Sequence, residues 1–243
     1  VFLLFASVAA MAFQGGWRDD REVAMDLRQN GAVRDREHTV SYYDAGALPD
    51  AAMDEFSALL DRGVEDISKF AGVPIPERKI TYFISGRIDI SRARGRSIYL
   101  PLERVRTHAA PYLHETTHIL VPCEDCPLWL SEGYASFVQS YVSEHMGGYD
   151  GQIFTRNGNT GVDRDALRWL ANDRGQAMLP FVGTNLEEPD LSDRRSVAAP
   201  FYVLSQSLVK YLVEKTGQKD LRALADIKDL TALREKWVSG LKG

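Results

Sequence analysis

Cysteine is scarce in this sequence, which has two in 243 residues, Cys123 and Cys126. Because there is no second pair, a structural zinc site made of four cysteines is excluded. The two cysteines stand three positions apart in the run CEDC. In an exported protein we expect such a pair to form a short disulfide; in a cytosolic protein it would be redox-active or supply half of a metal site. The sequence leaves these alternatives open.

An excess of basic residues is also lacking. The chain has 29 lysines and arginines against 34 aspartates and glutamates, a formal net charge of −5 and a pI near 5.6. A nucleic-acid surface normally shows as a basic patch or stripe, so we predict no nucleic-acid partner. The hydrophobic share of 44% is ordinary for a globular protein, and the length is sufficient for a core without metals or disulfides.

The apolar stretch VFLLFASVAAMAF (residues 1–13) is shorter than the about 20 residues that a membrane-spanning helix needs. It matches the apolar region of a signal peptide, and Ala10-Met11-Ala12 is a small-x-small cleavage site, although the usual positive region is missing. A buried N-terminal helix or strand is the alternative. We interpret residues 1–12 as a signal peptide or apolar leader. The protein is then expected to be exported, periplasmic or extracellular, with this segment as its candidate membrane anchor.

Internal repeats and low-complexity tracts are absent, so the organisation is inferred from local patterns. Residues 13–37 are polar and charge-rich, and we interpret them as a linker or a marginal helix. Residues 50–71 space apolar side chains at steps of three and four, which predicts an amphipathic helix. Strands are predicted at 38–45, 79–85 and 97–102, with a polar hairpin or loop between the last two.

The second half of the chain has mainly helical patterns. The elements predicted from residue 103 onward are a helix containing HETTH, a helix from near Pro127 to Gly147, a loop at 149–163, a short helix at 164–173, a long connection at 173–199, a helix at 200–217, and short helices near 218–227 and 230–240. The predicted fold class is α+β. A β-rich part at 38–102 forms a small mixed β-sheet, and a mostly helical part follows at 103–243.

The run YLHETTHIL (residues 112–120) places two histidines four positions apart, with a glutamate directly after the first. Residues four apart lie on one face of an α-helix, so His114 and His118 can bind one zinc ion through a ring nitrogen each. Glu115 is turned away from that face. It can lie beside the open coordination position and take a proton from zinc-bound water as general base. A polar stripe on an ordinary helix is the alternative.

Catalytic zinc needs a third protein ligand, and Glu132 is the candidate. It follows His118 by fourteen residues, in the run LWLSEGYASF on the next predicted helix. A short bend through Pro122 and Pro127 can turn that helix back toward the histidines, and an anionic ligand partly neutralises the ion. The sequence therefore predicts a Zn²⁺ site made by His114, His118 and Glu132.

The runs HETTH and PLWLSEGYASF together resemble the gluzincin metallopeptidases, the thermolysin and aminopeptidase superfamily. They are most similar to the short peptidase-MA-like members, whose second motif reads W-L-x-E-G-x-A. The likeness covers about residues 78–228, with SIYLPL in the place of the edge strand that lines the cleft. It implies a zincin-like metallopeptidase domain at 38–243 with an active-site helix, Zn²⁺ as cofactor and a peptide or protein as substrate.

The resemblance also implies a tyrosine that hydrogen-bonds the oxyanion of the transition state. Tyr202, in the run FYVLSQSLVKYLVEKTG, is the candidate, and a core aromatic on an amphipathic helix is the alternative. Tyr134 is a rival, but its position two residues after Glu132 favours a packing role. The other histidines lack ligand spacing, and we expect them at the surface or in packing: His38, His108 and His145.

One motif of the superfamily is missing from this chain. The aminopeptidases carry Gly-x-Met-x-Asn before the zinc helix, where this sequence reads GRSIYLPLERV. We therefore predict an endopeptidase, with the substrate paired along the strand at 97–101. The main alternative is a catalytically inactive peptidase-like protein that binds a peptide or protein partner in the cleft. A chance motif in a structural helical protein is the third interpretation.

Overall fold

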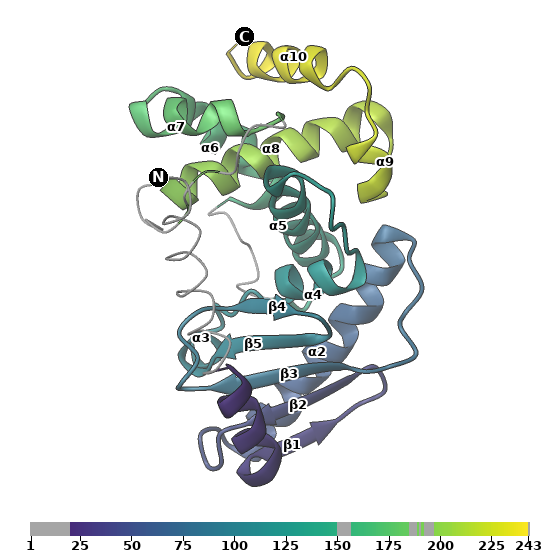
Figure 1. The fold of residues 1–243 in the computed structure, drawn as a ribbon, viewed down its shortest axis with the longest axis vertical. Coiled ribbons are helices and arrows are strands. Elements are labelled where there is room, and N and C mark those ends of the chain that lie inside the picture. The colour runs from purple at the N-terminus through teal and green to yellow at the C-terminus, as the bar shows by residue number, and fades with distance from the viewer. Residues whose placement is uncertain (1–19, 150–156, 185–188, 190, 192–196, 243) are drawn as a thin grey trace, which may run out of the picture. The chain divides into compact units, whose positions relative to one another are not determined.

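The structure is a computed structural model in which residues 20–149, 157–184, 189, 191 and 197–242 are described (Figure 1). The predicted leader at 1–12 lies outside the described residues. The chain divides into two units: unit 1 comprises Val1–Arg62 and Pro76–Tyr112, and unit 2 comprises Gly63–Ile75 and Leu113–Gly243. Within the described part of the chain, no helix has the length and apolar character required to cross a bilayer.

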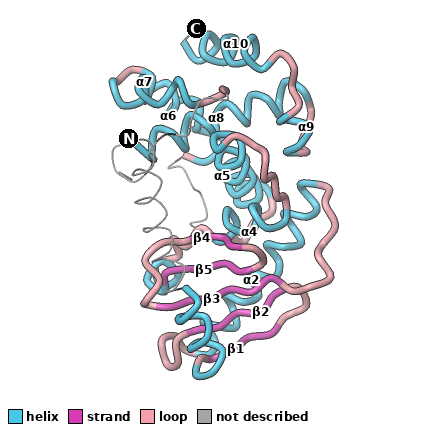
Figure 2. Tube along the Cα trace, viewed as in Figure 1, coloured by secondary structure: helices cyan, strands magenta, loops and turns pink. Residues whose placement is uncertain are grey.

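Unit 1 is built on a five-stranded mixed sheet (Figure 2). In order across the sheet the strands are β1 Ala32–Asp35, β2 Thr39–Tyr43, β3 Ile80–Ser85, β5 Ser97–Pro101 and β4 Arg92–Arg94. The two outer pairs are antiparallel and the two inner pairs are parallel. The predicted strands at 38–45, 79–85 and 97–102 are confirmed as β2, β3 and β5, and the small mixed sheet agrees with the predicted class.

The prediction that residues 97–101 form the edge strand is wrong. β5 lies between β3 and β4, and Arg92 and Arg94 stand opposite Tyr99 and Ser97. Gly95 makes this possible, since its φ of +57° suits a two-residue hairpin turn that folds the polar segment back onto β5. The edge on this side of the sheet is therefore the arginine-rich strand β4, which sequence analysis interprets only as a polar hairpin or loop.

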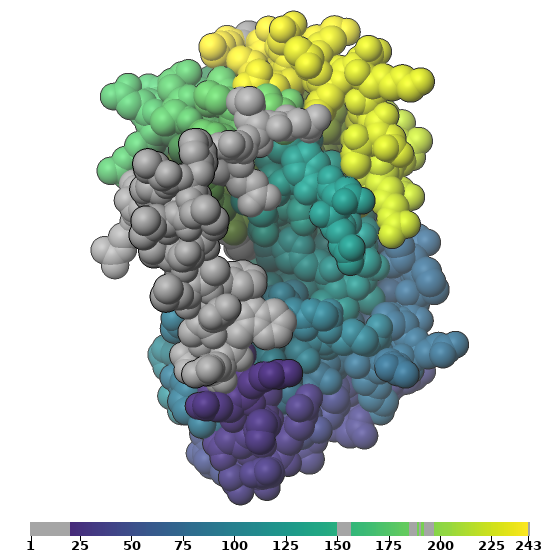
Figure 3. Space-filling view, viewed as in Figure 1, coloured from purple at the N-terminus to yellow at the C-terminus, as the bar shows by residue number. Residues whose placement is uncertain are grey.

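Residues 20–30 form a helix that packs on one face of the sheet (purple in Figure 3). Its apolar stripe is Val23, Ala24 and Leu27, and it covers Phe83 and Tyr99. Of the two interpretations of residues 13–37, a linker or a marginal helix, the described part agrees with a helix at 20–30, and β1 follows it. The stripe has only three apolar residues, and β1 has alternating half-buried and exposed residues without a buried one, so neither element has a strong sequence pattern.

Helix α2, Asp50–Ala71, has the bounds predicted from its apolar spacing. In unit 1 its N-terminal half is joined to β2 by buried hydroxyl contacts. Ser57 Oγ lies 2.7 Å from both Ser41 Oγ and the Tyr43 hydroxyl. A short helix, α3 Leu102–Arg106, follows β5 directly.

Unit 2 is helical, as the sequence predicts for the second half. From α4 onward the elements are α4 Tyr112–Leu120, α5 Leu128–His145, α6 Gly158–Leu170, α7 Asp173–Met178, η1 Leu179–Phe181, α8 Ala199–Thr216, α9 Leu221–Ala225 and α10 Leu230–Lys242. Helix α8 ends at Gly217, whose φ of +70° gives the left-handed C-cap expected for glycine at that place.

Two predicted boundaries in unit 2 are wrong. Helix α6 begins at Gly158, inside the loop predicted at 149–163, and the connection predicted at 173–199 contains α7 and η1. Asn172 starts α7 by accepting hydrogen bonds from the amides of Arg174 and Gly175. The helix has six residues and one glycine, so its apolar periodicity is too short to be recognised in the sequence.

Candidate metal centre

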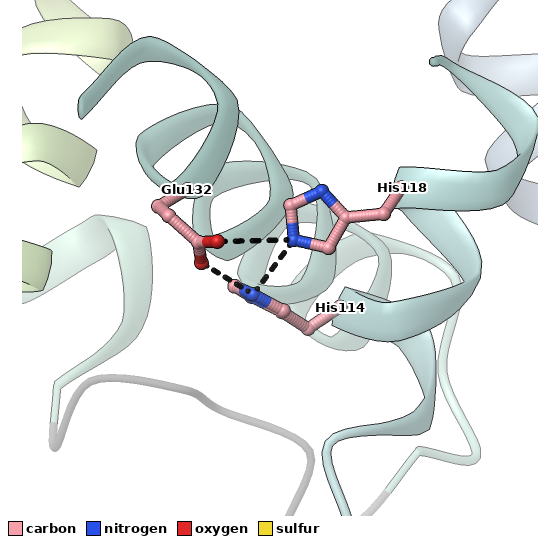
Figure 4. Close-up of side chains that lie close together, drawn as sticks. All are labelled: His114, His118 and Glu132. Carbon is pink, nitrogen blue, oxygen red and sulfur yellow. Dashed lines mark hydrogen bonds and ion pairs between the residues drawn. The ribbon is translucent and has the colours of Figure 1, made fainter. Parts of the chain in front are cut away.

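Helix α4 carries the two histidines on one face. His114 Nε2 lies 3.2 Å from His118 Nε2, as expected for side chains one helical turn apart (Figure 4). The side chain of His114 is 5% exposed and that of His118 is 22% exposed. One ring is therefore enclosed by the helices, and the other reaches the solvent side of the site.

Helix α5 brings the third candidate ligand to the histidine pair. Glu132 Oε2 lies 3.0 Å from His114 Nε2, and Glu132 Oε1 lies 3.6 Å from His118 Nε2. The three side chains converge from two helices joined by the segment 121–127 (Figure 4). The structure therefore brings together all three residues that the sequence predicts as zinc ligands.

The spacing of these atoms fits a tetrahedral ion. With zinc–ligand bonds of about 2.0–2.1 Å, tetrahedral geometry places ligand atoms about 3.3 Å apart. The three observed separations are 3.0, 3.2 and 3.6 Å. Two imidazole nitrogens and one carboxylate are also the donor types of catalytic zinc sites, which leave the fourth position open. The residues present therefore fit Zn²⁺ with little movement.

Two serines of α5 lie behind the histidines. Ser136 Oγ donates a hydrogen bond of 2.8 Å to the carbonyl of Glu132, and it lies 3.5 Å from His114 Nδ1. Ser131 Oγ lies 3.4 Å from His118 Nδ1. When a metal is bound, a serine oxygen that accepts a hydrogen bond from Nδ1–H would leave the Nε2 lone pair of each ring for the metal. Neither serine is among the residues expected from the sequence, although Ser136 lies four residues after Glu132 and so on the same helix face.

In the metal-free site, charge and burial shift the pKa values of Glu132 and His118 in opposite directions. Burial raises the pKa of Glu132, but hydrogen bonds and charge from His114 and His118 outweigh it and hold that pKa well below the ordinary 4.5. Burial lowers the pKa of His118, but hydrogen bonding and charge from Glu132, with the charge of Glu115, raise it above the ordinary 6.5. Without a metal, both shifts favour a charged His118 imidazole beside an ionised Glu132 carboxylate.

Glu115 and Tyr202 flank the three candidate ligands. Glu115 is 7% exposed, and its charge acts on His118. The Tyr202 ring, on the first turn of α8, lies with its centroid 6.2 Å from that of His114, edge to face. The rival Tyr134 is fully buried and donates a hydrogen bond of 2.6 Å to the carbonyl of Lys219, which agrees with the packing role predicted for it.

The two cysteines form a disulfide between α4 and α5. Cys123 and Cys126 have their α-carbons 5.3 Å apart. A disulfide is the alternative that the sequence analysis gives for an exported protein, and in this disulfide form the pair supplies no cysteine half-site for a metal. The third histidine of unit 2, His145, stacks on Tyr141 at the end of α5 and takes no part in the site.

Comparisons with known proteins give distant similarity only. No protein-family model matches the chain, and no curated protein matches it. Two solved structures are similar to it, an M1 zinc metallopeptidase from Deinococcus radiodurans and a mutant of the same enzyme. For each, the TM-score is 0.41 and the identity 17%, over 87% of this chain. The chain spans 43% of the length of those proteins.

Proposed function

We propose that this protein is a zinc-dependent peptidase that hydrolyses peptide bonds in a peptide or protein substrate. The observation that supports this most directly is the meeting of His114 Nε2, His118 Nε2 and the Glu132 carboxylate at separations of 3.0–3.6 Å, close to those of a tetrahedral zinc ion. A glutamate follows the first histidine directly on the same helix, as in zinc hydrolases with this spacing.

Zinc bound at such a site acts as a Lewis acid and lowers the pKa of a coordinated water toward neutrality. Glu115 then serves as general base. It accepts a proton from the attacking water and passes that proton to the departing amine. Its position supports this role, because Glu115 is buried next to His118 and so lies beside the candidate ligands.

We propose that the Tyr202 hydroxyl donates a hydrogen bond to the oxyanion that forms in the transition state. Its ring lies edge-on to His114, and its side chain is only partly buried, so it borders the candidate centre from α8. A hydrogen bond made only when charge develops on the carbonyl oxygen raises the rate without tightening substrate binding.

We further propose cleavage within a chain instead of at its N-terminus. The stretch before the zinc helix reads GRSIYLPLERV and lacks the Gly-x-Met-x-Asn run of the aminopeptidases that the sequence resembles. A peptide library that contains free and acetylated N-termini distinguishes the two modes. Equal cleavage of both forms supports an endopeptidase, and cleavage of free N-termini alone contradicts it.

We also propose that the protein acts outside the cytoplasm. The disulfide Cys123–Cys126 supports this, because disulfides persist in oxidising compartments and are rare in the cytosol. Alkylation of the protein in intact cells, followed by mass spectrometry, measures the state of the pair. Two alkylated thiols in the native protein would contradict the proposed location.

The central experiment replaces Glu115 with glutamine in the zinc-loaded protein. Glutamine keeps the shape but accepts no proton, so peptide cleavage is expected to fall by about 10²–10⁴-fold while zinc content stays the same. The matched control is Glu55→Gln, at an exposed position on α2, with unchanged activity expected. Full activity of Glu115→Gln with zinc retained removes this residue from the reaction. Zinc binding without any cleavage by the unmodified protein favours a peptidase-like binding protein.

A further inference from the structure

The segment between the two helices of the candidate centre carries the disulfide. Helix α4 ends at Leu120, two residues after His118, and α5 begins at Leu128, four residues before Glu132. We propose that the disulfide Cys123–Cys126 is a positioning element, which fixes this turn and so holds Glu132 within bonding distance of the histidines. The inference rests on the proposed metal site, and it adds a determinant of metal affinity outside the ligands.

Hydrogen bonds restrain the two ends of the turn more firmly than its centre. The amide of Val121 donates to the carbonyl of Thr117 at 2.9 Å, which continues α4, and the amide of Leu130 donates to the carbonyl of Pro127 at 2.9 Å, which starts α5. Between them, the amide of Cys126 reaches the carbonyl of Cys123 at 3.4 Å. The covalent link therefore closes the turn where its backbone hydrogen bond is longest.

The turn also lies beside open space. Residues 122–130 line a cavity of about 1070 Å³, together with residues 222, 224–228, 230 and 231. In the space-filling view the yellow atoms of the C-terminal helices adjoin the teal atoms of this part of the chain (Figure 3). Glu124 and Asp125, between the cysteines, are exposed. A turn that borders a cavity has fewer packing contacts to fix it, so the disulfide has more effect on its shape.

A disulfide this short has its effect on local geometry more than on overall stability. The two cysteines are three positions apart, and the entropic effect of a cross-link on the unfolded chain grows with the length of the loop it closes. Zinc sites, by contrast, are sensitive to displacements of a few tenths of an ångström, since zinc–ligand distances vary little around about 2.0–2.2 Å. Loss of the disulfide is therefore expected to weaken zinc binding while the fold is retained.

The test measures the zinc dissociation constant by competition with a chromophoric chelator, starting from metal-free protein. Three forms are compared: the oxidised protein, the protein reduced with a phosphine, and the double variant Cys123→Ser/Cys126→Ser. Reduction transfers two electrons from the phosphine, which takes up oxygen from water, and two protons to the sulfurs. We expect zinc to bind about tenfold or more weakly in both altered forms, similar to the loss on removing a group that orients a ligand.

Controls separate positioning from unfolding and from new ligands. Circular dichroism and thermal unfolding of the metal-free forms are expected to show a retained fold, and the phosphine is expected not to change zinc binding by the double variant. The reduced unmutated protein gives the same comparison if the double variant fails to fold. Equal affinity in oxidised and reduced protein, or tighter binding through the freed thiols, overturns the positioning role alone. Absence of zinc binding in the oxidised protein overturns both this role and the proposed metal site.

Discussion

Gly133 of α5 faces the backbone of Ser205 of α8 at a separation that no larger residue tolerates. A Cβ placed at Gly133 would lie 2.6 Å from the carbonyl oxygen of Ser205 and 2.7 Å from its carbonyl carbon. The two helices are thus in close contact near the candidate site. Gly133 directly follows Glu132 on α5, and Ser205 follows Tyr202 by three residues on α8. The glycine of the SEG run therefore has a packing explanation: it allows α8 to approach the helix that carries the third candidate ligand.

Replacing Gly133 with alanine is expected to separate α5 from α8. We expect a loss of about 1–3 kcal/mol in the free energy of unfolding, because the added methyl group meets backbone that cannot rotate away. Urea denaturation measures it. The matched control is Gly240→Ala, in α10, where an added Cβ has no atom within 4 Å. That substitution should stabilise the protein by up to about 1 kcal/mol through helix propensity. Equal effects at the two positions would contradict the explanation.

Ser136→Ala is expected to weaken zinc binding without unfolding α5. The hydroxyl lies 3.5 Å from His114 Nδ1, and its loss leaves the imidazole less firmly oriented. We expect an increase of about tenfold in the zinc dissociation constant, measured by chelator competition. Ser143→Ala is the control, because Ser143 makes the same type of bond to the carbonyl four residues before it on the same helix. Its zinc affinity should equal that of the unmodified protein.

Zinc affinity should rise with pH and then level off. In the metal-free protein the pKa of His118 is raised above 6.5, so below that pKa zinc must displace a proton. One displaced proton gives roughly a tenfold change in apparent affinity per pH unit. The pKa of Glu132 is lowered, so its carboxylate stays ionised and adds no slope in this range. Isothermal titration from about pH 5.5 to about pH 9 tests this. A constant affinity across the range would refute it.

The raised pKa of His118 and the lowered pKa of Glu132 make the stability of the metal-free protein depend on pH in opposite directions. The raised pKa of His118 contributes stability that is complete below pH 6.5 and is lost as the pH rises through the folded-state value. The lowered pKa of Glu132 contributes stability that is complete above pH 4.5 and is lost on acidification through its folded-state value. As far as these two groups decide it, chelator-treated protein is therefore expected to be most stable between pH 4.5 and pH 6.5.

His108→Gly is expected to stabilise unit 1. His108 has a φ of +53° at the end of α3, where the amide of Ala109 donates to the carbonyl of Arg104 as in a helix that ends in a left-handed residue. Glycine adopts this conformation without steric cost, and we expect a gain of about 0.5–1 kcal/mol in thermal or urea unfolding. His108→Ala is the control, since it removes the ring but keeps the strain. A gain with alanine equal to that with glycine would point to the ring instead.

The candidate centre could be predicted from sequence because its residues are close together in the chain. The spacing of His114 and His118 depends only on helix geometry, and Glu132 follows on the next helix after a short turn. Helix α2 was predicted to its ends for a similar reason, since its length allows many apolar repeats. Patterns of this kind depend only on residues within one helix or within two consecutive helices, so the sequence is sufficient to predict them.

Features that depend on distant contacts were not predictable in the same way. Strand β4 is a strand because it pairs with β5, and RAR alone has no strand pattern. The helix at 20–30 is stabilised by its packing on Phe83 and Tyr99, more than fifty residues away in the chain. Ser131 and Ser136 lie close to Glu132 in the sequence, but serine occurs in so many other roles that its presence alone does not predict a contact with a histidine ligand.

All three candidate ligands, the neighbouring Glu115 and both orienting serines lie between positions 112 and 136, a run of 25 residues that forms α4, its disulfide-closed turn and the first half of α5. Because these residues lie in one uninterrupted stretch of chain, the stretch can be moved as one insertion. A designer could graft it between two antiparallel helices of an unrelated host and transfer the donor set without rebuilding distant loops.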